Sequence, residues 1–199
     1  MKIIVVGGTG TIGKAVVNEL AQRHTVIVAG HKHGDVQLDI ADPQSIERLY
    51  QAVGKFDALV ATTGTVHFAA LSDMTTEKYQ IGLQSKLMGQ INLVLIGLRY
   101  IADAGSFTLT SGILNRDPIK AGSSAAMVNG AIDAFIRSAA IEMPRAIRIN
   151  AVSPTILTES MARYADYFRG FKPVDAADVA LAYSKSVEGA QTGQVYRVG

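Results

Sequence analysis

Hydrophobic residues along the chain form short runs that alternate with stretches of helical spacing. The first run, residues 3–6, is β-branched throughout with no polar alternation, as in a parallel strand buried on both faces. Apolar positions then recur on one helical face over residues 12–20. Later apolar runs predict strands over residues 25–29, 36–39, 57–61, 106–110, 147–152 and 194–198.

The stretches between these runs predict helices. Residues 43–53 have a clear helix start, with Asp42 as N-cap and Pro43 in the first position. Residues 123–142 and 175–188 also read as helices, and residues 75–102 as one long or two consecutive helices.

Strands that alternate with helices predict an α/β fold. We expect a doubly wound parallel sheet between two helical layers, a Rossmann fold, with the first strand central. Residues 1–199 show no internal repeat or linker and form one predicted domain. Only residues 30–35 separate the second and third strands, too few for a crossover helix, so this connection should be shortened.

A glycine-rich turn joins the first strand to the first helix. Glycines permit unusual backbone angles and let a pyrophosphate approach the helix N-terminus. A merely tight turn is the alternative, but the strand–loop–helix context favours a dinucleotide site. The residues predicted to bind the cofactor here are Gly7, Gly8, Thr9, Gly10, Thr11, Ile12 and Gly13.

The composition limits the binding partners, the metal sites and the cellular location that we expect. A net charge of +2 gives no support for binding nucleic acid or an anionic membrane, and 48% hydrophobic residues suit a sheet buried on both faces. The absence of cysteine excludes disulfides and thiolate metal sites, and we predict no metal site. Met1 leads directly into the first strand without a signal-peptide pattern, and charges interrupt every long apolar run. We therefore expect a cytoplasmic protein.

Several short motifs follow the glycine loop in a distinctive order. They are Leu38-Asp39-Ile40-Ala41-Asp42, Ala61-Thr62-Thr63-Gly64, Thr110-Ser111, the segment 148–154 (RINAVSP), Asp178-Val179-Ala180 and Thr192-Gly193-Gln194-Val195. In this order and spacing the chain resembles the short-chain dehydrogenase/reductase family along nearly its whole length. The resemblance implies further cofactor contacts from Asp39, Ile40, Ala61, Thr62, Thr63, Gly64, Pro154 and Leu157.

The chain departs from the family pattern at the positions of the family's catalytic residues. The resemblance places Ser111 at the family's catalytic serine, but Ala125 at its tyrosine and Asn129 at its lysine. No tyrosine lies between Tyr100 and Tyr164. In addition, Thr11 and Thr155 replace two family glycines.

Lys86 stands where the family has a supporting asparagine. The resemblance therefore implies that lysine and asparagine have exchanged places between two neighbouring sites, which would keep a cation near the nicotinamide ribose. We take Ser111, Lys86 and Asn129 as the candidate catalytic residues. The alternatives are that Lys86 is a solvated helix lysine, that Asn129 is a filler left after catalysis was lost, and that Ser111 only caps a strand.

Four further side chains are candidates for proton donation or for covering the substrate. His67 follows the fourth strand and could donate a proton near neutral pH, although an exposed loop histidine is the more common case. The resemblance places Tyr164, Tyr167 and Phe168 in the segment that covers substrate, where we expect lid packing.

The residues at the end of the second strand indicate which nicotinamide cofactor the protein prefers. The strand end carries His31, Lys32 and His33, with no carboxylate before Asp35, and this charge suits a 2′-phosphate. Solvated loop charge is the alternative reading. We predict NADP as cofactor, with NAD as the alternative.

Three functions from different classes are compatible with the sequence. The first is an oxidoreductase that transfers a hydride between NADP(H) and a small carbonyl or alcohol substrate. The second is an NADP-binding sensor or scaffold subunit without turnover, and non-redox chemistry on the same fold is a third reading. We expect a homodimer or homotetramer that pairs through helices 75–102 and 123–142, since residues 123–142 are rich in small side chains.

Overall fold

The computed structural model describes residues 1–199 as one seven-stranded parallel sheet in the order β3-β2-β1-β4-β5-β6-β7. This confirms the predicted doubly wound fold, with β1 inside the sheet between β2 and β4. The strands are β1 Lys2–Val6, β2 Thr25–Gly30, β3 Val36–Gln37, β4 Phe56–Ala61, β5 Ile101–Thr110, β6 Arg148–Pro154 and β7 Val195–Val198.

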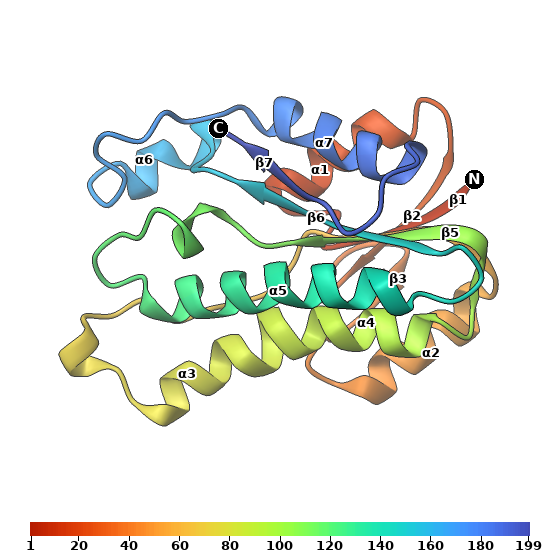
Figure 1. Cartoon of the computed structure of the whole chain (residues 1–199), viewed down its shortest axis with the longest axis horizontal. Helices are drawn as coiled ribbons and strands as arrows, with labels where there is room; N and C mark the ends of the chain where they lie inside the picture. Colours follow the sequence, from red (N-terminus) through yellow and green to blue (C-terminus); the bar gives the residue numbers. More distant parts are fainter.

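Helices cover both faces of the sheet (Figure 1). The α-helices are α1 Thr11–Leu20, α2 Pro43–Val53, α3 Thr76–Gly82, α4 Gln90–Gly97, α5 Ser123–Glu142, α6 Met161–Tyr164 and α7 Ala176–Glu188. A π-helix, η2 Leu83–Gly89, joins α3 to α4, and short 3₁₀ turns are η1 Leu71–Asp73, η3 Ile113–Asn115 and η4 Thr158–Ser160. None of the helices is both long and apolar enough to span a bilayer.

The alternation of side chains along β1 explains the two helical layers. Ile4 and Val6 belong to a core shared with α2, α4 and α5, whereas Ile3 and Val5 belong to a second core shared with α1 and α7. Successive residues of a strand point to opposite faces, so a run of four apolar residues buries both sides of the sheet. The unbroken apolar run in the sequence therefore indicates that helices cover both faces of this strand.

The connection between β2 and β3 contains no helix, as predicted. Residues 31–35 form a bend, and β3 is only two residues long, shorter than the predicted strand 36–39. The Asp35 carboxylate accepts a hydrogen bond from the Val28 amide at 2.8 Å, and the Asp35 amide donates to the Val28 carbonyl. These two hydrogen bonds hold the bend against β2, where a longer β3 would have paired with that strand.

The predicted helix end at residue 102 is wrong. Three consecutive helical elements, α3, η2 and α4, run from Thr76 to Gly97, and β5 already begins at Ile101, five residues before the predicted strand. Ile101 is buried and pairs with Phe56 of β4. Ala104 has a φ of 58° and the β4–β5 register shifts between Phe56 and Ala58, so β5 begins with an irregular segment that period-two patterning does not reveal.

Candidate active site

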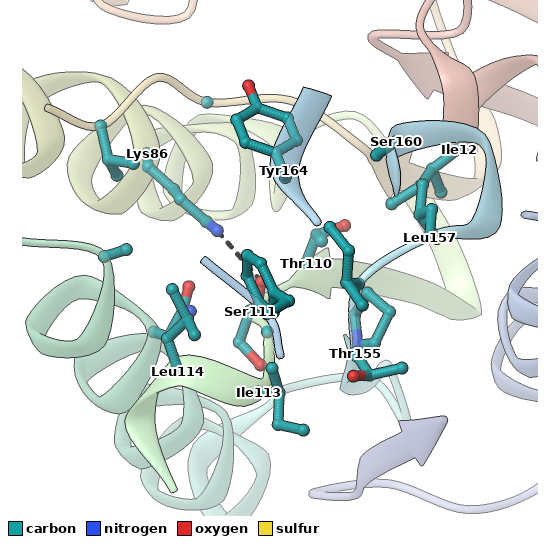
Figure 2. Close-up of a pocket in the computed structure, with 18 of the residues that line it drawn as sticks. Ile12, Lys86, Thr110, Ser111, Ile113, Leu114, Thr155, Leu157, Ser160 and Tyr164 are labelled. Carbon is teal, nitrogen blue, oxygen red and sulfur yellow. Dashed lines mark hydrogen bonds between the residues drawn. The ribbon is translucent and has the colours of Figure 1, made fainter. Parts of the chain in front are cut away.

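A cavity of about 650 Å³ opens at the carboxyl ends of β4, β5 and β6. Its walls come from the segments that follow these strands, from η2 and α5, and from the chain around α6. Lys86, Ser111 and Asn129 all line it, so three side chains far apart in the sequence meet in one space. Figure 2 shows Lys86 and Ser111 approaching one another, with Tyr164 and Leu157 on the other walls.

The Lys86 side chain is half-buried and extends into the cavity. Its Nζ donates a hydrogen bond to the Ser111 carbonyl at 3.0 Å, the dashed line in Figure 2. Desolvation by burial lowers the pKa of Lys86 to about 8, and the negative charge of Asp133 opposes part of this effect. An amine with such a pKa holds its proton at neutral pH but can release it readily.

The backbone around Lys86 depends on Gly64. Gly64 has a φ of 127°, and a Cβ placed on it would lie 2.7 Å from the Lys86 Cα. Any side chain at this position would collide with the lysine and strain the loop. The glycine after β4 therefore lets η2 approach closely enough for Lys86 to reach Ser111.

Gln90 fixes the same region, and sequence reasoning missed it. Its Nε2 donates to the carbonyls of Lys86 and Thr110 at 2.9 and 3.0 Å, and its Oε1 accepts from the Thr110 amide at 2.8 Å. Gln90 is fully buried. Its position in an apolar helical segment was the available signal, because a buried polar side chain must find partners.

Ser111 and Asn129 present unpartnered polar atoms. Ser111 Oγ and Asn129 Oδ1 are buried and form no hydrogen bond within the protein, although the Ser111 amide pairs with the Val152 carbonyl. Asn129 makes no direct hydrogen bond to Lys86. Ala125, one helical turn before Asn129, also lines the cavity and leaves open the volume that a larger side chain would fill. Buried polar atoms without partners fit a site that accepts a ligand or water.

Glycines let the loop after β1 pack closely on the start of α1. Gly10 precedes α1 without a side-chain cap, so the first amides of the helix remain available, as they do at any uncapped helix start. A Cβ on Gly13 would lie 2.0 Å from the Gly7 carbonyl oxygen, so only glycine lets the helix pack on the loop.

The predicted cofactor residues outside the adenosine side divide into three groups. Ile12, Thr62, Thr63, Gly64, Pro154 and Leu157 line the cavity. Thr9, Gly10 and Thr11 line a second hollow of about 610 Å³ between α1 and the start of α7. Gly7, Gly8, Gly13 and Ala61 line neither space and belong to the loop, the start of α1 and the end of β4.

The predicted adenosine side contains exposed and buried members. His31 and Lys32 are exposed in the bend after β2. The Asp39 carboxylate accepts from the Ala41 amide at 2.9 Å. Ile40 is buried against η2, because a Cβ on Gly89 would lie 2.9 Å from its Cδ1.

Some of the remaining candidate residues line the cavity and others do not. His67 does not line the cavity, whereas Tyr164, Tyr167 and Phe168 do. The Arg163 guanidinium lies 5.2 Å from the centre of the Tyr164 ring. No group of three histidine, aspartate or glutamate side chains could hold a metal ion.

Known proteins resemble the chain over nearly its whole length. Residues 4–195 match the family model described as Enoyl-(Acyl carrier protein) reductase. The crystal structure of the protein lin1944 from Listeria innocua is 53% identical, with a TM-score of 0.99 and full coverage of both chains. A small-chain dehydrogenase in complex with NADPH is 28% identical, with a TM-score of 0.88 over 100% of this chain and 96% of that one.

A curated relative is similar at lower identity. L-xylulose reductase from Homo sapiens is 24% identical over 180 residues, which cover 81% of this chain and 74% of the relative. The family match over nearly the whole chain agrees with the order of motifs in the sequence. The protein therefore belongs to the short-chain dehydrogenase/reductase family.

Proposed function

We propose that this protein is an NADP(H)-linked oxidoreductase that interconverts a small carbonyl compound and its alcohol. The observation that carries the proposal is the convergence of Lys86 Nζ and the unpartnered Ser111 Oγ in a cavity beside the glycine loop. The NADPH complex of a similar dehydrogenase supports the choice of cofactor.

The residues present fit a dinucleotide. The uncapped start of α1 would hold the pyrophosphate, and Thr62, Thr63 and Pro154 would surround the nicotinamide half. Asp39 and Ile40 would adjoin the adenine, while His31 and Lys32 would meet a 2′-phosphate. When bound, the nicotinamide supplies or accepts the hydride.

The protein's own groups would act on the substrate oxygen. Ser111 Oγ has no competing partner and would donate a hydrogen bond to the carbonyl oxygen. The Lys86 ammonium would stabilise the negative charge that develops there. With its pKa lowered to about 8, Lys86 would also pass its proton to the alkoxide, the task that tyrosine performs in the family. Asn129 would orient water or a ribose hydroxyl through its free Oδ1.

Turnover tests the proposal directly. We expect NADPH oxidation, followed by absorbance, with at least one member of a panel of small aldehydes and ketones. Lys86→Met should lower kcat by about 100-fold, the usual effect of removing a general acid. Lys55→Met, which removes an exposed lysine in the turn before β4, is the matched control and should leave turnover unchanged.

The competing function is NADP binding without turnover. It is favoured by one observation, the absence of any tyrosine at the position of Ala125. Tight NADPH binding together with no reduction of any carbonyl in the panel would support a sensor or scaffold and contradict the oxidoreductase.

Cofactor choice is tested in the bend after β2. Lys32→Ala should weaken NADP binding about ten-fold, since a charge-assisted hydrogen bond to phosphate contributes about 1.5–3 kcal/mol. NAD binding should stay nearly unchanged, because its ribose carries no phosphate for the lysine to meet. Equal losses for the two cofactors, measured by calorimetry, would show that this bend does not read the 2′-phosphate.

A further inference from the structure

The walls of the cavity carry positive charge and no negative charge. Half of the 24 residues that line it are hydrophobic, among them Ile113, Leu114 and Ile156. The two charged residues that line it are Lys86 and Arg163, and no aspartate or glutamate does so. An apolar cavity whose only charges are cations favours a ligand that carries an anionic group of its own.

Arg163 has no acidic partner within the protein. Two acids lie close to it in the sequence, and each is engaged elsewhere. Both oxygens of the Glu159 carboxylate accept from the Ala176 amide, at 2.9 and 3.3 Å, and the Asp166 carboxylate pairs with Arg169 at 3.0 Å. An arginine side chain carries five donors in a planar fork that matches a carboxylate. The donors of Arg163 are therefore available to a ligand.

The Tyr164 ring orients the Arg163 guanidinium. The guanidinium carbon lies 5.2 Å from the ring centre, within the range of a cation–π contact, and both residues line the cavity. Figure 2 shows Tyr164 on a different wall from Lys86 and Ser111. Arg163 itself is exposed to solvent, so it stands where the cavity opens. The two cations thus mark two separate parts of the cavity wall.

The segment that carries Arg163 is fixed at its base. The Thr158 amide donates to the Val174 carbonyl at 2.9 Å, and the Val174 amide donates to the Ile156 carbonyl at 3.0 Å. Leu157 and Val174 also form an isolated parallel bridge. Residues 159–173 therefore project from a closed base, which keeps Arg163 at the cavity.

We propose that Arg163 binds the carboxylate of the substrate, and that the preferred substrates are small aliphatic oxo acids and the corresponding hydroxy acids. The carbonyl oxygen would lie at Ser111 and Lys86, and the carbon chain would pack on the apolar walls between them and Arg163. The carbonyl end of this assignment rests on the function proposed above. The carboxylate takes no part in the reaction, which remains the interconversion of a carbonyl and its alcohol.

Turnover of matched acids and esters tests the proposal. The substrates would be 4-oxopentanoate, 5-oxohexanoate and 6-oxoheptanoate, each beside its methyl ester, because the series varies the distance between carbonyl and carboxylate. For the best acid we expect kcat/KM to exceed that of its ester by about five-fold, the size that an ion pair open to solvent allows. A kcat/KM that is equal for acid and ester throughout the series would overturn the proposal.

Variants assign the preference to Arg163. Arg163→Gln should raise KM for the acid by about five-fold and leave the ester unchanged, while Arg163→Lys should retain part of the preference. Lys172→Gln is the matched control, since it removes an exposed positive charge from the same segment without lining the cavity. It should leave the preference unchanged. An Arg163→Gln variant that still prefers the acid would overturn the proposal.

Binding of an unreactive pair gives a second readout that needs no turnover. Hexanoate and hexanamide would be titrated into Lys86→Met, in which Arg163 is the remaining cation of the cavity, and followed by NMR through the methyl signals of Ile113 and Ile119. Hexanoate should bind about five-fold more tightly than hexanamide, and adding Arg163→Gln should abolish the difference. Hexanoate that binds no more tightly than hexanamide, or not at all, would overturn the proposal.

Cofactor binding separates this site from a phosphate contact and from the function proposed above. Arg163→Gln should leave the Kd for NADPH unchanged. If it weakens NADPH binding while the preference for acids persists, Arg163 serves the cofactor and the inference is wrong. Turnover of neutral aldehydes and ketones without preference for acids would also overturn the inference but leave the oxidoreductase standing. Arg163-dependent hexanoate binding with no turnover of any carbonyl would contradict the oxidoreductase and support the carboxylate site.

Discussion

Residues with small or absent side chains give the cavity much of its shape. Ala125 leaves space where a tyrosine would stand, and Gly64 and Gly112 let the neighbouring side chains of Lys86 and Asn129 approach the backbone. Lys86 gains its orientation from this arrangement, because its stem packs on Gly64 while its amine reaches Ser111. The lysine position therefore depends on a glycine 22 residues earlier in the chain.

Replacement of that glycine should be costly. Gly64→Ala would place a methyl group 2.7 Å from the Lys86 Cα at a φ of 127°, and we expect a loss of about 2 kcal/mol in the free energy of unfolding. Gly54→Ala is the matched control, since Gly54 also has a positive φ but no atom within 4 Å of the new Cβ. It should cost about 1 kcal/mol. Urea unfolding of both variants measures the difference, and similar small losses would mean that the loop moves freely away from Lys86.

The charge of Lys86 should oppose folding at neutral pH. Its pKa is about 8 in the folded protein against 10.5 for the ordinary side chain, so the unfolded chain binds the proton more tightly. The resulting penalty is fully present below pH 8 and disappears as the pH rises to 10.5. Lys86→Met should therefore raise the free energy of unfolding by about 1–2 kcal/mol near pH 7.

The pH dependence identifies the cause of that stabilisation. Urea unfolding at several pH values should show the gain of Lys86→Met shrinking between pH 8 and 10.5. Lys55→Met should show no such trend. A gain that is constant with pH would assign the effect to methionine packing and not to the buried charge.

At the level of elements, the sequence predicted the strands and most helices because burial on two faces leaves an unambiguous apolar pattern. The predicted N-cap is an example: Asp42 accepts from the Gln44 amide at 2.9 Å at the start of α2. The π-helix η2 was not predictable in this way, since a local change from α to π hydrogen bonding does not alter which residues are apolar. The role of Gln90 was missed for a related reason, because Thr110, its partner in β5, lies 20 residues further along the chain.

Gln90, the first residue of α4, links the end of the π-helix to β5. Gln90→Leu would remove the hydrogen bonds that satisfy the Thr110 amide and the carbonyls of Thr110 and Lys86. Leaving buried backbone groups unpaired should cost about 2–4 kcal/mol in the free energy of unfolding. Gln84→Leu, at an exposed position of the same π-helix, should cost less than about 0.5 kcal/mol. Equal Tm values for the two variants would show that Gln90 does not hold η2.

On the scale of the whole molecule, one helical layer carries exposed apolar side chains. Figure 1 shows α3, α4 and α5 running along the same side of the sheet. The exposed apolar residues on this layer are Ile81, Met88, Leu95, Met127 and Ile141. Apolar side chains grouped on one face favour association, and self-complementary pairing about a two-fold axis is the commonest arrangement for identical chains. We therefore keep the prediction that these helices form a homodimer interface, with a homotetramer as the larger alternative.

Two leucines of similar exposure on opposite layers allow a test of that interface. Leu95 on α4 is 53% exposed and Leu181 on α7 is 55% exposed. A charge buried in an apolar interface is strongly unfavourable, and a two-fold interface that contains residue 95 would bury one such charge from each chain. Leu95→Glu should therefore shift the protein to a monomer in analytical ultracentrifugation, whereas Leu181→Glu should leave the dimer intact. If the unmodified protein is monomeric at high concentration, the layer has no partner of its own kind; if only Leu181→Glu dissociates it, the interface lies on the α1–α7 side.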